Sequence, residues 1–249
     1  MSTHYDAATR ARWRSAMGHG ASVLAVVGGH AQVEPGWFVA LSGLPDPDAN
    51  LALVHHDDPA ALAAVLREVE RVGAPAAVIL AGDGTALAAR LPAGWDHVGA
   101  MPFMTLALAS AAVAADPRVR PAGTADGDAV VALFGAAFGL APEVAEMIRP
   151  LIHAGAPTRV WLLEDDGQPV SAVVAGRVGD VETIWCMSTP QHFARRGYGR
   201  ALLNAVLAAA KAEGATVALL GATEAGFPLY DATGWQTVEP WEMYVQGGH

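Results

Sequence analysis

The stretch Arg195-Arg-Gly-Tyr-Gly-Arg200 is the part of this sequence that carries the most information about fold and function. It lies between a strand-like run, residues 182–189, and a helix-like run, residues 201–211. Glycines at such a turn let the backbone approach a ligand closely. The free N–H groups and the dipole of a helix start favour an anion there, and arginines add forked donors that suit phosphate oxygens. The turn therefore predicts a ligand that carries a pyrophosphate.

Two common nucleotide-binding turns do not fit this stretch. A P-loop requires Gly-x-x-x-x-Gly-Lys-Ser/Thr, and the sequence contains no such run. A dinucleotide-binding turn requires Gly-x-Gly-x-x-Gly/Ala and an acidic residue about 20 positions later. Here Leu202 takes the place of the third glycine, and residues 217–221 are Val-Ala-Leu-Leu-Gly. These departures disfavour an oxidoreductase with a nicotinamide or flavin dinucleotide.

The turn resembles the acyl-coenzyme A turn of the GNAT acetyltransferase family, whose signature is Gln/Arg-x-x-Gly-x-Gly/Ala at the start of a central helix. Gly197 and Gly199 match the glycine positions, whereas Ala194 stands where Gln or Arg is usual. A second stretch, Tyr230-Asp-Ala-Thr-Gly-Trp235, resembles the family's Tyr-x-x-x-Gly-Phe motif. Much of the chain from residue 119 to residue 245 follows the family's order of strands and helices. The resemblance implies an N-acetyltransferase that uses acetyl-coenzyme A as co-substrate.

The first half of the chain resembles a degenerate copy of the second, as a search for internal repeats shows. Helix-like residues 61–73 are similar to residues 202–214, and a Gly-Trp pair follows each of them, at positions 94–95 and 234–235. We therefore expect an α/β (α+β) protein with tandem GNAT folds, each a central mixed twisted sheet flanked by helices.

The expected domains follow one another along the chain. Residues 1–110 form a degenerate N-terminal unit, residues 111–121 a linker that contains small residues and proline, and residues 122–249 the catalytic unit. In the first copy, residues 50–59 replace the phosphate turn with a glycine-free run that contains two acids. We expect that the first unit binds no coenzyme A. It then either has a structural role or walls the acceptor pocket of the second unit.

Composition and charge restrict the class of partner. The chain has 249 residues, of which 53% are hydrophobic, with 15 basic and 25 acidic side chains. An acidic protein is a poor partner for nucleic acid and weakly attracts a cationic amine. The single cysteine, Cys186, allows no internal disulfide, and the sequence has neither a long apolar stretch nor a signal peptide. We expect a cytoplasmic protein without a membrane partner. We expect no metal site, because the adjacent His55 and His56 do not have the spacing of metal ligands on one face of an element.

The resemblance implies positions for the donor. The pantetheine arm is expected to pair with the edge of the central strand, at Met187, Ser188 and Thr189. The pyrophosphate is expected to bind the backbone of the turn, at Arg195, Arg196, Gly197, Tyr198, Gly199 and Arg200.

The resemblance also implies catalytic candidates, each with a structural alternative. Tyr230 is the candidate acid that protonates the leaving thiolate, or it is a core aromatic. Glu182 is the candidate base for the attacking ammonium, or it is a carboxylate at a strand end beside the turn at residues 179–180. Cys186 is expected to be buried and inert. Four aromatic residues form either an acceptor pocket or part of the core: Trp161, Trp185, Phe138 and Phe227.

The function expected from these observations is direct transfer of an acyl group, acetyl being favoured, from coenzyme A to an amine of a small molecule. Two alternatives stay open: a coenzyme A-binding or scaffold protein without catalysis, and a GNAT protein that takes its acyl group from a carrier-protein thioester. The sequence identifies neither the acceptor nor the choice between monomer and homodimer, because fold does not fix substrate.

Overall fold

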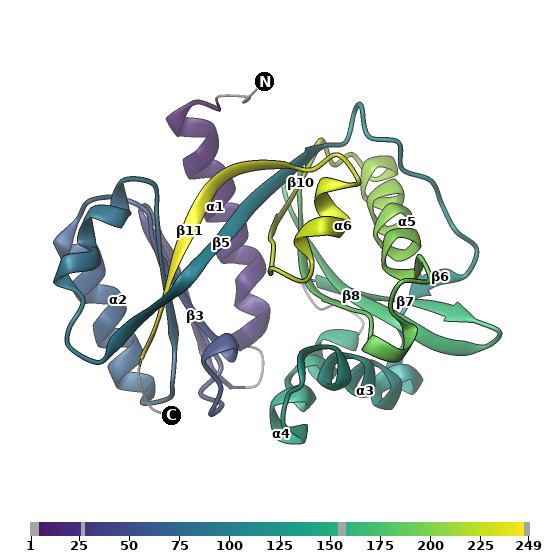
Figure 1. Cartoon of the computed structure of the whole chain (residues 1–249), viewed down its shortest axis with the longest axis horizontal. Coiled ribbons are helices and arrows are strands. Elements are labelled where there is room, and N and C mark those ends of the chain that lie inside the picture. Colours follow the sequence, from purple (N-terminus) through teal and green to yellow (C-terminus); the bar gives the residue numbers. More distant parts are fainter. Residues whose placement is uncertain (1–4, 26–27, 154–157, 247–249) are drawn as a thin grey trace. The chain divides into compact units, whose positions relative to one another are not determined.

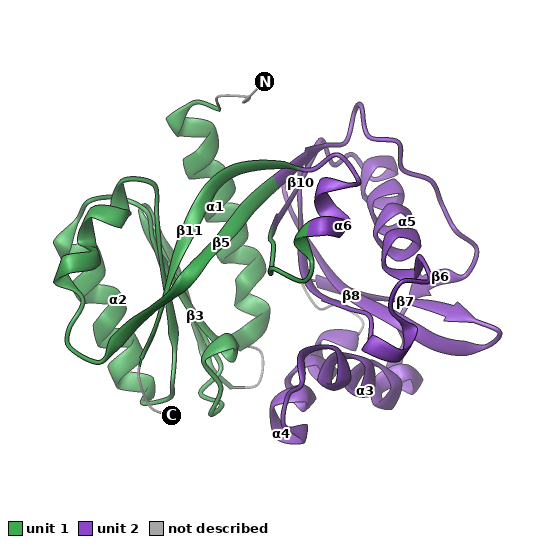
Figure 2. Ribbon diagram, in the orientation of Figure 1, with its two compact units in different colours: residues 1–104, 221–227, 236–249 green, residues 105–220, 228–235 purple. Residues whose placement is uncertain are grey.

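The computed structural model describes residues 5–25, 28–153 and 158–246, and its chain forms two compact units (Figure 1). Unit 1 consists of Met1–Met104, Gly221–Phe227 and Gln236–His249, and unit 2 of Thr105–Leu220 and Pro228–Trp235 (Figure 2). Each unit contains strands of one mixed sheet with helices against them. The α/β fold class expected from the sequence is confirmed.

Unit 1 has six strands in the order β1-β2-β3-β4-β11-β5. β1, β2 and β3 are antiparallel, β3 and β4 are parallel, and β11 runs antiparallel to β4. Its helices and strands are α1 (Ala7–Ala21), η1 (Ser22–Ala25), β1 (His30–Glu34), β2 (Trp37–Leu41), η2 (Pro47–Ala49), β3 (Asn50–Val54), α2 (Pro59–Val72), β4 (Ala77–Ala81), η3 (Gly82–Arg90), β5 (Trp95–Ala107) and β11 (Gln236–Gln246), where η marks a 3-10 helix.

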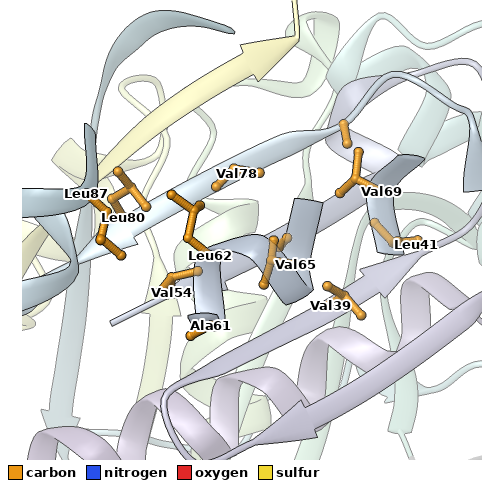
Figure 3. Close-up of a cluster of buried hydrophobic side chains, with 12 residues drawn as sticks. Val39, Leu41, Val54, Ala61, Leu62, Val65, Val69, Val78, Leu80 and Leu87 are labelled. Carbon is orange, nitrogen blue, oxygen red and sulfur yellow. The ribbon is translucent and has the colours of Figure 1, made fainter. Parts of the chain in front are cut away.

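Helix α2 covers one face of this sheet because apolar side chains on one face of the strands pack against apolar side chains on one side of the helix. Strand side chains alternate between faces, whereas a helix brings residues three or four positions apart onto one side. The buried cluster in Figure 3 combines alternate residues of β2, β3 and β4 with one side of α2. Its members are Val39, Leu41, Ala52, Val54, Ala61, Leu62, Val65, Val69, Ala76, Val78, Leu80 and Leu87. In Figure 1, α1 lies on the opposite side of the strands from α2.

The strand that ends the chain completes unit 1, not the unit that precedes it in sequence. β11 pairs with β4 from Trp241↔Ala81 to Val245↔Ala77. Trp241 is fully buried, and its ring stacks on Phe103 with 4.4 Å between the centroids. The segments Gly221–Phe227 and Gln236–His249 therefore belong with unit 1, and the contiguous domain boundaries expected from the sequence stay a prediction.

Unit 2 has five strands in the order β10-β9-β8-β7-β6. β6 to β9 are antiparallel neighbours, and β9 is parallel to β10. Its elements are β6 (Val119–Pro121), η4 (Thr124–Asp126), α3 (Gly127–Phe138), α4 (Pro142–Ala145), η5 (Glu146–Ile152), β7 (Thr158–Asp165), β8 (Gln168–Val178), β9 (Val181–Ser188), η6 (Gln191–Phe193), α5 (Tyr198–Ala212), β10 (Val217–Gly221) and α6 (Phe227–Asp231).

Helices α3 and α5 lie on opposite sides of β7 and β8 in Figure 1. The sequence predicts a single helix over residues 142–153, whereas the chain forms the short α4 and then the 3-10 helix η5, which contains Pro150. Proline has no N–H to donate and its ring clashes with the preceding turn, so a regular helix does not continue there. Within the described residues, none of the helices is both long enough and apolar enough to span a bilayer.

Candidate active site

The strands β9 and β10 pair only at their beginnings. Their parallel register runs from Val217↔Val181 to Leu219↔Thr183, and β9 continues to Ser188 beyond the last pair. The pairing of β8 with β9 shifts between Ala172 and Val174, and Cys186 has a φ of 51°. An extra residue of this kind bends a strand and increases its twist. The edge of β9 beyond Thr183 is therefore open to an added extended chain.

The turn expected to bind phosphate follows directly. Two of its residues have left-handed backbone angles, Arg195 at φ 64° and Gly197 at φ 84°, and α5 begins at Tyr198. In the described chain the N–H groups of residues 195–200 make no hydrogen bond to a backbone oxygen, whereas that of Ala201 donates to the Gly197 oxygen at 3.0 Å. Gly197 also provides no side-chain cap for the helix. The helix start thus offers unused donors and the positive end of its dipole.

Three cations surround these donors. The side chains of Arg195, Arg196 and Arg200 are exposed, and none forms an ion pair with another described residue. Exposed guanidinium groups beside free N–H groups suit an anion with several oxygens.

Unit 1 provides an internal contrast at its helix α2, which also follows a strand of a parallel pair. There Asp58 caps the helix by accepting a hydrogen bond from the Ala60 N–H at 2.9 Å, and Pro59 supplies no N–H. β3 and β4 remain paired as far as Val54↔Leu80, at the end of β3. A carboxylate at the helix start and strands that stay together both disfavour an anionic, extended ligand at this position.

The residues at the end of β9 are held by neighbours that the sequence interpretation did not include. Ser171 on β8 donates its hydroxyl to the Ser188 oxygen at 2.9 Å and lies 2.8 Å from the Thr189 hydroxyl. A Cβ added to Gly199 would lie 3.4 Å from Thr189 Oγ1 and 3.5 Å from Met187 Cε. Met187 and Thr189 therefore lie against the start of α5, which connects the open strand edge to the turn.

Tyr230 lies on α6, and the spacing of its motif has a physical explanation. The N–H of Trp235 donates to the Tyr230 oxygen at 3.1 Å, the N–H of Gly234 donates to the Asp231 oxygen at 3.2 Å, and Gly234 has a φ of 87°. These two bonds form a Schellman motif at the end of the helix. This motif favours a contact between the side chains of Tyr230 and Trp235, whose ring centroids lie 5.7 Å apart.

The chemical state of Tyr230 is set by burial. Its side chain is 6% exposed, and burial raises the pKa of its phenol to about 12. No hydrogen bond holds the phenol group within the described residues. A protonated hydroxyl without an internal partner is available to donate to a ligand.

Glu182 lies in the paired part of β9, opposite Ala218 of β10. It is 3% exposed and accepts a hydrogen bond at 2.7 Å from Nε of Arg177, which also donates to the Ala210 oxygen at the end of α5. Burial raises the pKa of Glu182, and Arg177 opposes that rise. The turn at residues 179–180 could have indicated this pair, because a two-residue turn places residue 177 opposite residue 182.

The remaining candidates differ in exposure. Cys186 is half-buried, and burial raises its thiol pKa to about 12, so the nucleophilic thiolate is scarce at neutral pH. Trp161 is 8% exposed, whereas Phe138 is 42% exposed. The indole N–H groups of Trp185 and Trp235 are buried without a hydrogen-bond partner. Among the described residues, no group of three or more His, Cys, Asp or Glu is placed to hold a metal ion.

Comparison with known proteins gives a consistent assignment. Residues 156–237 match the family described as "Acetyltransferase (GNAT) domain". A comparison with curated protein sequences found no match.

Solved structures show the fold over both units. A GCN5-related N-acetyltransferase from Kribbella flavida has a TM-score of 0.66 at 19% identity, over 94% of this chain and 96% of that chain. A GCN5-related N-acetyltransferase from Sphaerobacter thermophilus has a TM-score of 0.56 at 16% identity, over 86% and 77%. A functionally unknown conserved protein from Staphylococcus epidermidis ATCC 12228 has a TM-score of 0.61 at 10% identity, over 88% and 93%. Residues 156–237 therefore match a GNAT acetyltransferase domain, and the solved structures share the fold over both units.

Proposed function

We propose that unit 2 is an acyl-coenzyme A-dependent N-acyltransferase that transfers an acyl group, acetyl in the simplest case, directly to an amine of a small molecule. The observation that carries the proposal is the open edge of β9 beside an uncapped helix start with exposed arginines. An extended arm that ends in a pyrophosphate needs both features next to each other. The closeness of Gly199 to Met187 and Thr189 supports such a neighbourhood.

The residues of unit 2 fit a coenzyme A thioester by the chemistry of their donors. The backbone of Met187, Ser188 and Thr189 would hold the pantetheine amides, and the N–H groups from Arg195 to Arg200 would hold the pyrophosphate. Bound acetyl-coenzyme A supplies a thioester carbonyl that an amine attacks, with departure of the thiol. The Ala194 side chain offers no contact, but the free donors of the turn belong to its backbone and do not depend on that side chain.

Tyr230 is the proposed acid. Because its pKa is about 12, the phenol is protonated at neutral pH and can give a proton or a hydrogen bond to the departing sulfur. Glu182 is the proposed base, and its raised pKa suits a proton acceptor. Its hydrogen bond to Arg177 also suits a structural role for the carboxylate. If Glu182 is only structural, a water molecule takes the proton of the amine.

Three further parts of the proposal concern partners and context. The acidic surface suits a cationic amine acceptor, steered over distance. Unit 1 binds no coenzyme A, because Asp58 occupies the start of α2. The protein acts in the cytoplasm.

Calorimetric titration with acetyl-coenzyme A tests the donor site. We compare the wild type with Gly197→Asp, which places a carboxylate among the free N–H groups. Gly139→Asp is the matched control, because Gly139 also has a left-handed φ, 67°, open space for a Cβ and a place at the end of a helix. Loss of binding in Gly197→Asp alone supports the site.

A second pair of variants tests the charges. Arg196→Glu should weaken binding, whereas Arg67→Glu on the exposed surface of α2 should not. Wild-type protein that binds no acetyl-coenzyme A would contradict the proposal and would direct attention to carrier-protein thioesters. Binding without acetyl transfer in a screen of amines would favour the non-catalytic alternative.

A further inference from the structure

Tyr198 makes a side-chain contact that the sequence interpretation did not use. It is the first residue of α5, and its phenol donates to Oδ2 of Asp165 at 2.5 Å. Asp165 is the last residue of β7, beside the hairpin turn at Asp166 and Gly167, both with positive φ. The bond therefore joins the phosphate-binding turn to a hairpin that is distant in sequence.

A second residue fixes Asp165. Nη1 of Arg118 donates to Asp165 Oδ1 at 3.2 Å, and Arg118 also binds Asp116 through Nε at 3.1 Å and Nη2 at 2.8 Å. The hydrogen bond from Tyr198 and the charge of Arg118 lower the pKa of Asp165, so the group that accepts from Tyr198 is a carboxylate. Hydrogen bonds to ionised groups are about twice as strong as neutral ones.

Apart from the contact of Gly199 with Met187 and Thr189, the backbone of the turn has few bonds that hold it. Arg195 has a left-handed φ of 64°, a strained conformation for a residue other than glycine. The N–H groups of residues 195–200 make no backbone hydrogen bond in the described chain that would offset this strain. Donors that must converge on one anion bind it well only if their arrangement is fixed beforehand.

Charge alone gives no reason for a carboxylate at this position. Arg196 is close enough to lower the pKa of Asp165, so Asp165 reduces the positive potential of the turn. A negative charge there opposes the binding of a pyrophosphate. If the hydrogen bond from Tyr198 to Asp165 holds the turn, it strengthens pyrophosphate binding instead. The charge of Asp165 and its hydrogen bond therefore have opposite effects on the affinity for the donor.

We propose that Tyr198 and Asp165 form a latch that positions the turn for the pyrophosphate of the donor. This inference rests on the proposed function of unit 2. Both are positioning residues: neither side chain needs to touch the donor, and their contribution is confined to the part of the ligand that the turn binds.

The first test removes the phenol alone. Tyr198→Phe should weaken acetyl-coenzyme A binding about tenfold in calorimetry, the size expected for one hydrogen bond to a charged group. S-acetylpantetheine, which lacks the pyrophosphate and the nucleotide, should bind Tyr198→Phe and wild type within about twofold in ligand-detected NMR, since the latch acts only on the turn. Tyr5→Phe is the matched control, because Tyr5 also loses one phenol bond, to Gln236 in unit 1 at 3.2 Å.

The second test uses the opposite effects that the charge and the hydrogen bond of Asp165 have on donor affinity. Asp165→Ala removes a negative charge near the anion, yet the latch predicts weaker acetyl-coenzyme A binding. Asp165→Asn keeps an oxygen that accepts from Tyr198, so it should bind acetyl-coenzyme A more tightly than Asp165→Ala does. Asp166→Asn removes a charge from the same hairpin without contacting Tyr198, and Asn is well suited to its left-handed φ of 51°. It should bind at least as tightly as wild type.

The outcomes separate this inference from the proposed function. If Tyr198→Phe binds acetyl-coenzyme A as wild type does, or if Asp165→Ala binds more tightly, the latch is wrong while the donor site stands. If Tyr198→Phe weakens S-acetylpantetheine equally, the residue supports the fold of unit 2 generally, and the latch is again wrong. If the wild type binds no acetyl-coenzyme A, both proposals are wrong.

Discussion

Replacing Glu239 with alanine should strongly destabilise unit 1. Glu239 accepts a hydrogen bond from Arg14 Nε at 2.7 Å and a second bond from the same guanidinium. The two side chains are 7% and 10% exposed, and Trp241 Nε1 also donates to Glu239 at 3.0 Å. Glu239→Ala would leave a buried guanidinium whose remaining side-chain neighbour is His55, with Nδ1 at 3.3 Å.

The expected loss in the free energy of unfolding is a large fraction of the stability of a domain. Removing one partner of a buried ion pair costs about 3–5 kcal/mol, because the other charge stays in a poorly solvated place. Domains have a free energy of unfolding of only about 5–15 kcal/mol. The double variant Arg14→Met, Glu239→Leu removes both charges and keeps apolar volume. Its loss should be well below that of Glu239→Ala, since apolar replacements of buried pairs are often neutral or stabilising.

Urea unfolding gives the free energies, and hydrogen exchange with mass spectrometry shows where protection is lost. Glu242→Ala is the matched control: its carboxylate on the same strand lies 2.7 Å from His97 Nε2, but the two side chains are 30% and 48% exposed. The control should lose at most about 1 kcal/mol. A loss in Glu239→Ala no greater than in Glu242→Ala would refute the reasoning, as would faster exchange confined to unit 2.

Three further predictions concern single side chains. Tyr230→Phe should lower kcat at least about 100-fold while the KM for acetyl-coenzyme A stays unchanged, because only the departing sulfur loses a proton donor; an equal change in KM would indicate a binding role. The folded-state pKa of His55, about 4, lies below its usual 6.5 because of burial and the charge of Arg14, with further effects from His56 and Glu239. The unfolded chain therefore takes up a proton first, so the free energy of unfolding should fall from pH 6.5 towards pH 4, and His55→Gln should flatten that part of the pH profile in urea titrations. Cys186 should react with iodoacetamide at pH 7.5 much more slowly in native protein than in urea, because its pKa of about 12 keeps the thiol protonated; equal rates would show an accessible thiolate.

Local signals in the sequence predicted the fold well where short-range physics decides it. The turn with Gly197 and Gly199 follows a strand and opens a helix, as its glycines indicate. The spacing from Tyr230 to Trp235 corresponds to a helix end with a left-handed glycine, which local hydrogen bonds determine. Such features depend on a few neighbouring residues, so one sequence suffices to find them.

Features that depend on pairing between distant segments were not predictable in the same way. Nothing local to residues 236–246 shows that they pair with β4, since alternation of side chains fits any strand neighbour. The contacts of Tyr198 with Asp165 and of Ser171 with Thr189 likewise join segments that only the sheet brings together. The roles of Tyr230 and Glu182 as acid and base stay predictions.

The contrast between α2 and α5 is the physical basis for proposing a donor site in unit 2 and none in unit 1. Both helices follow a strand that pairs in parallel with the strand after the helix. At α2, the chain uses a carboxylate cap and a proline, which stabilise the helix by satisfying or removing its free N–H groups. At α5, it leaves the N–H groups unsatisfied and accepts a left-handed arginine. Forgoing a stabilising cap is disadvantageous for folding alone, and an uncapped start beside an open strand edge therefore supports the proposal that a ligand supplies the missing acceptors.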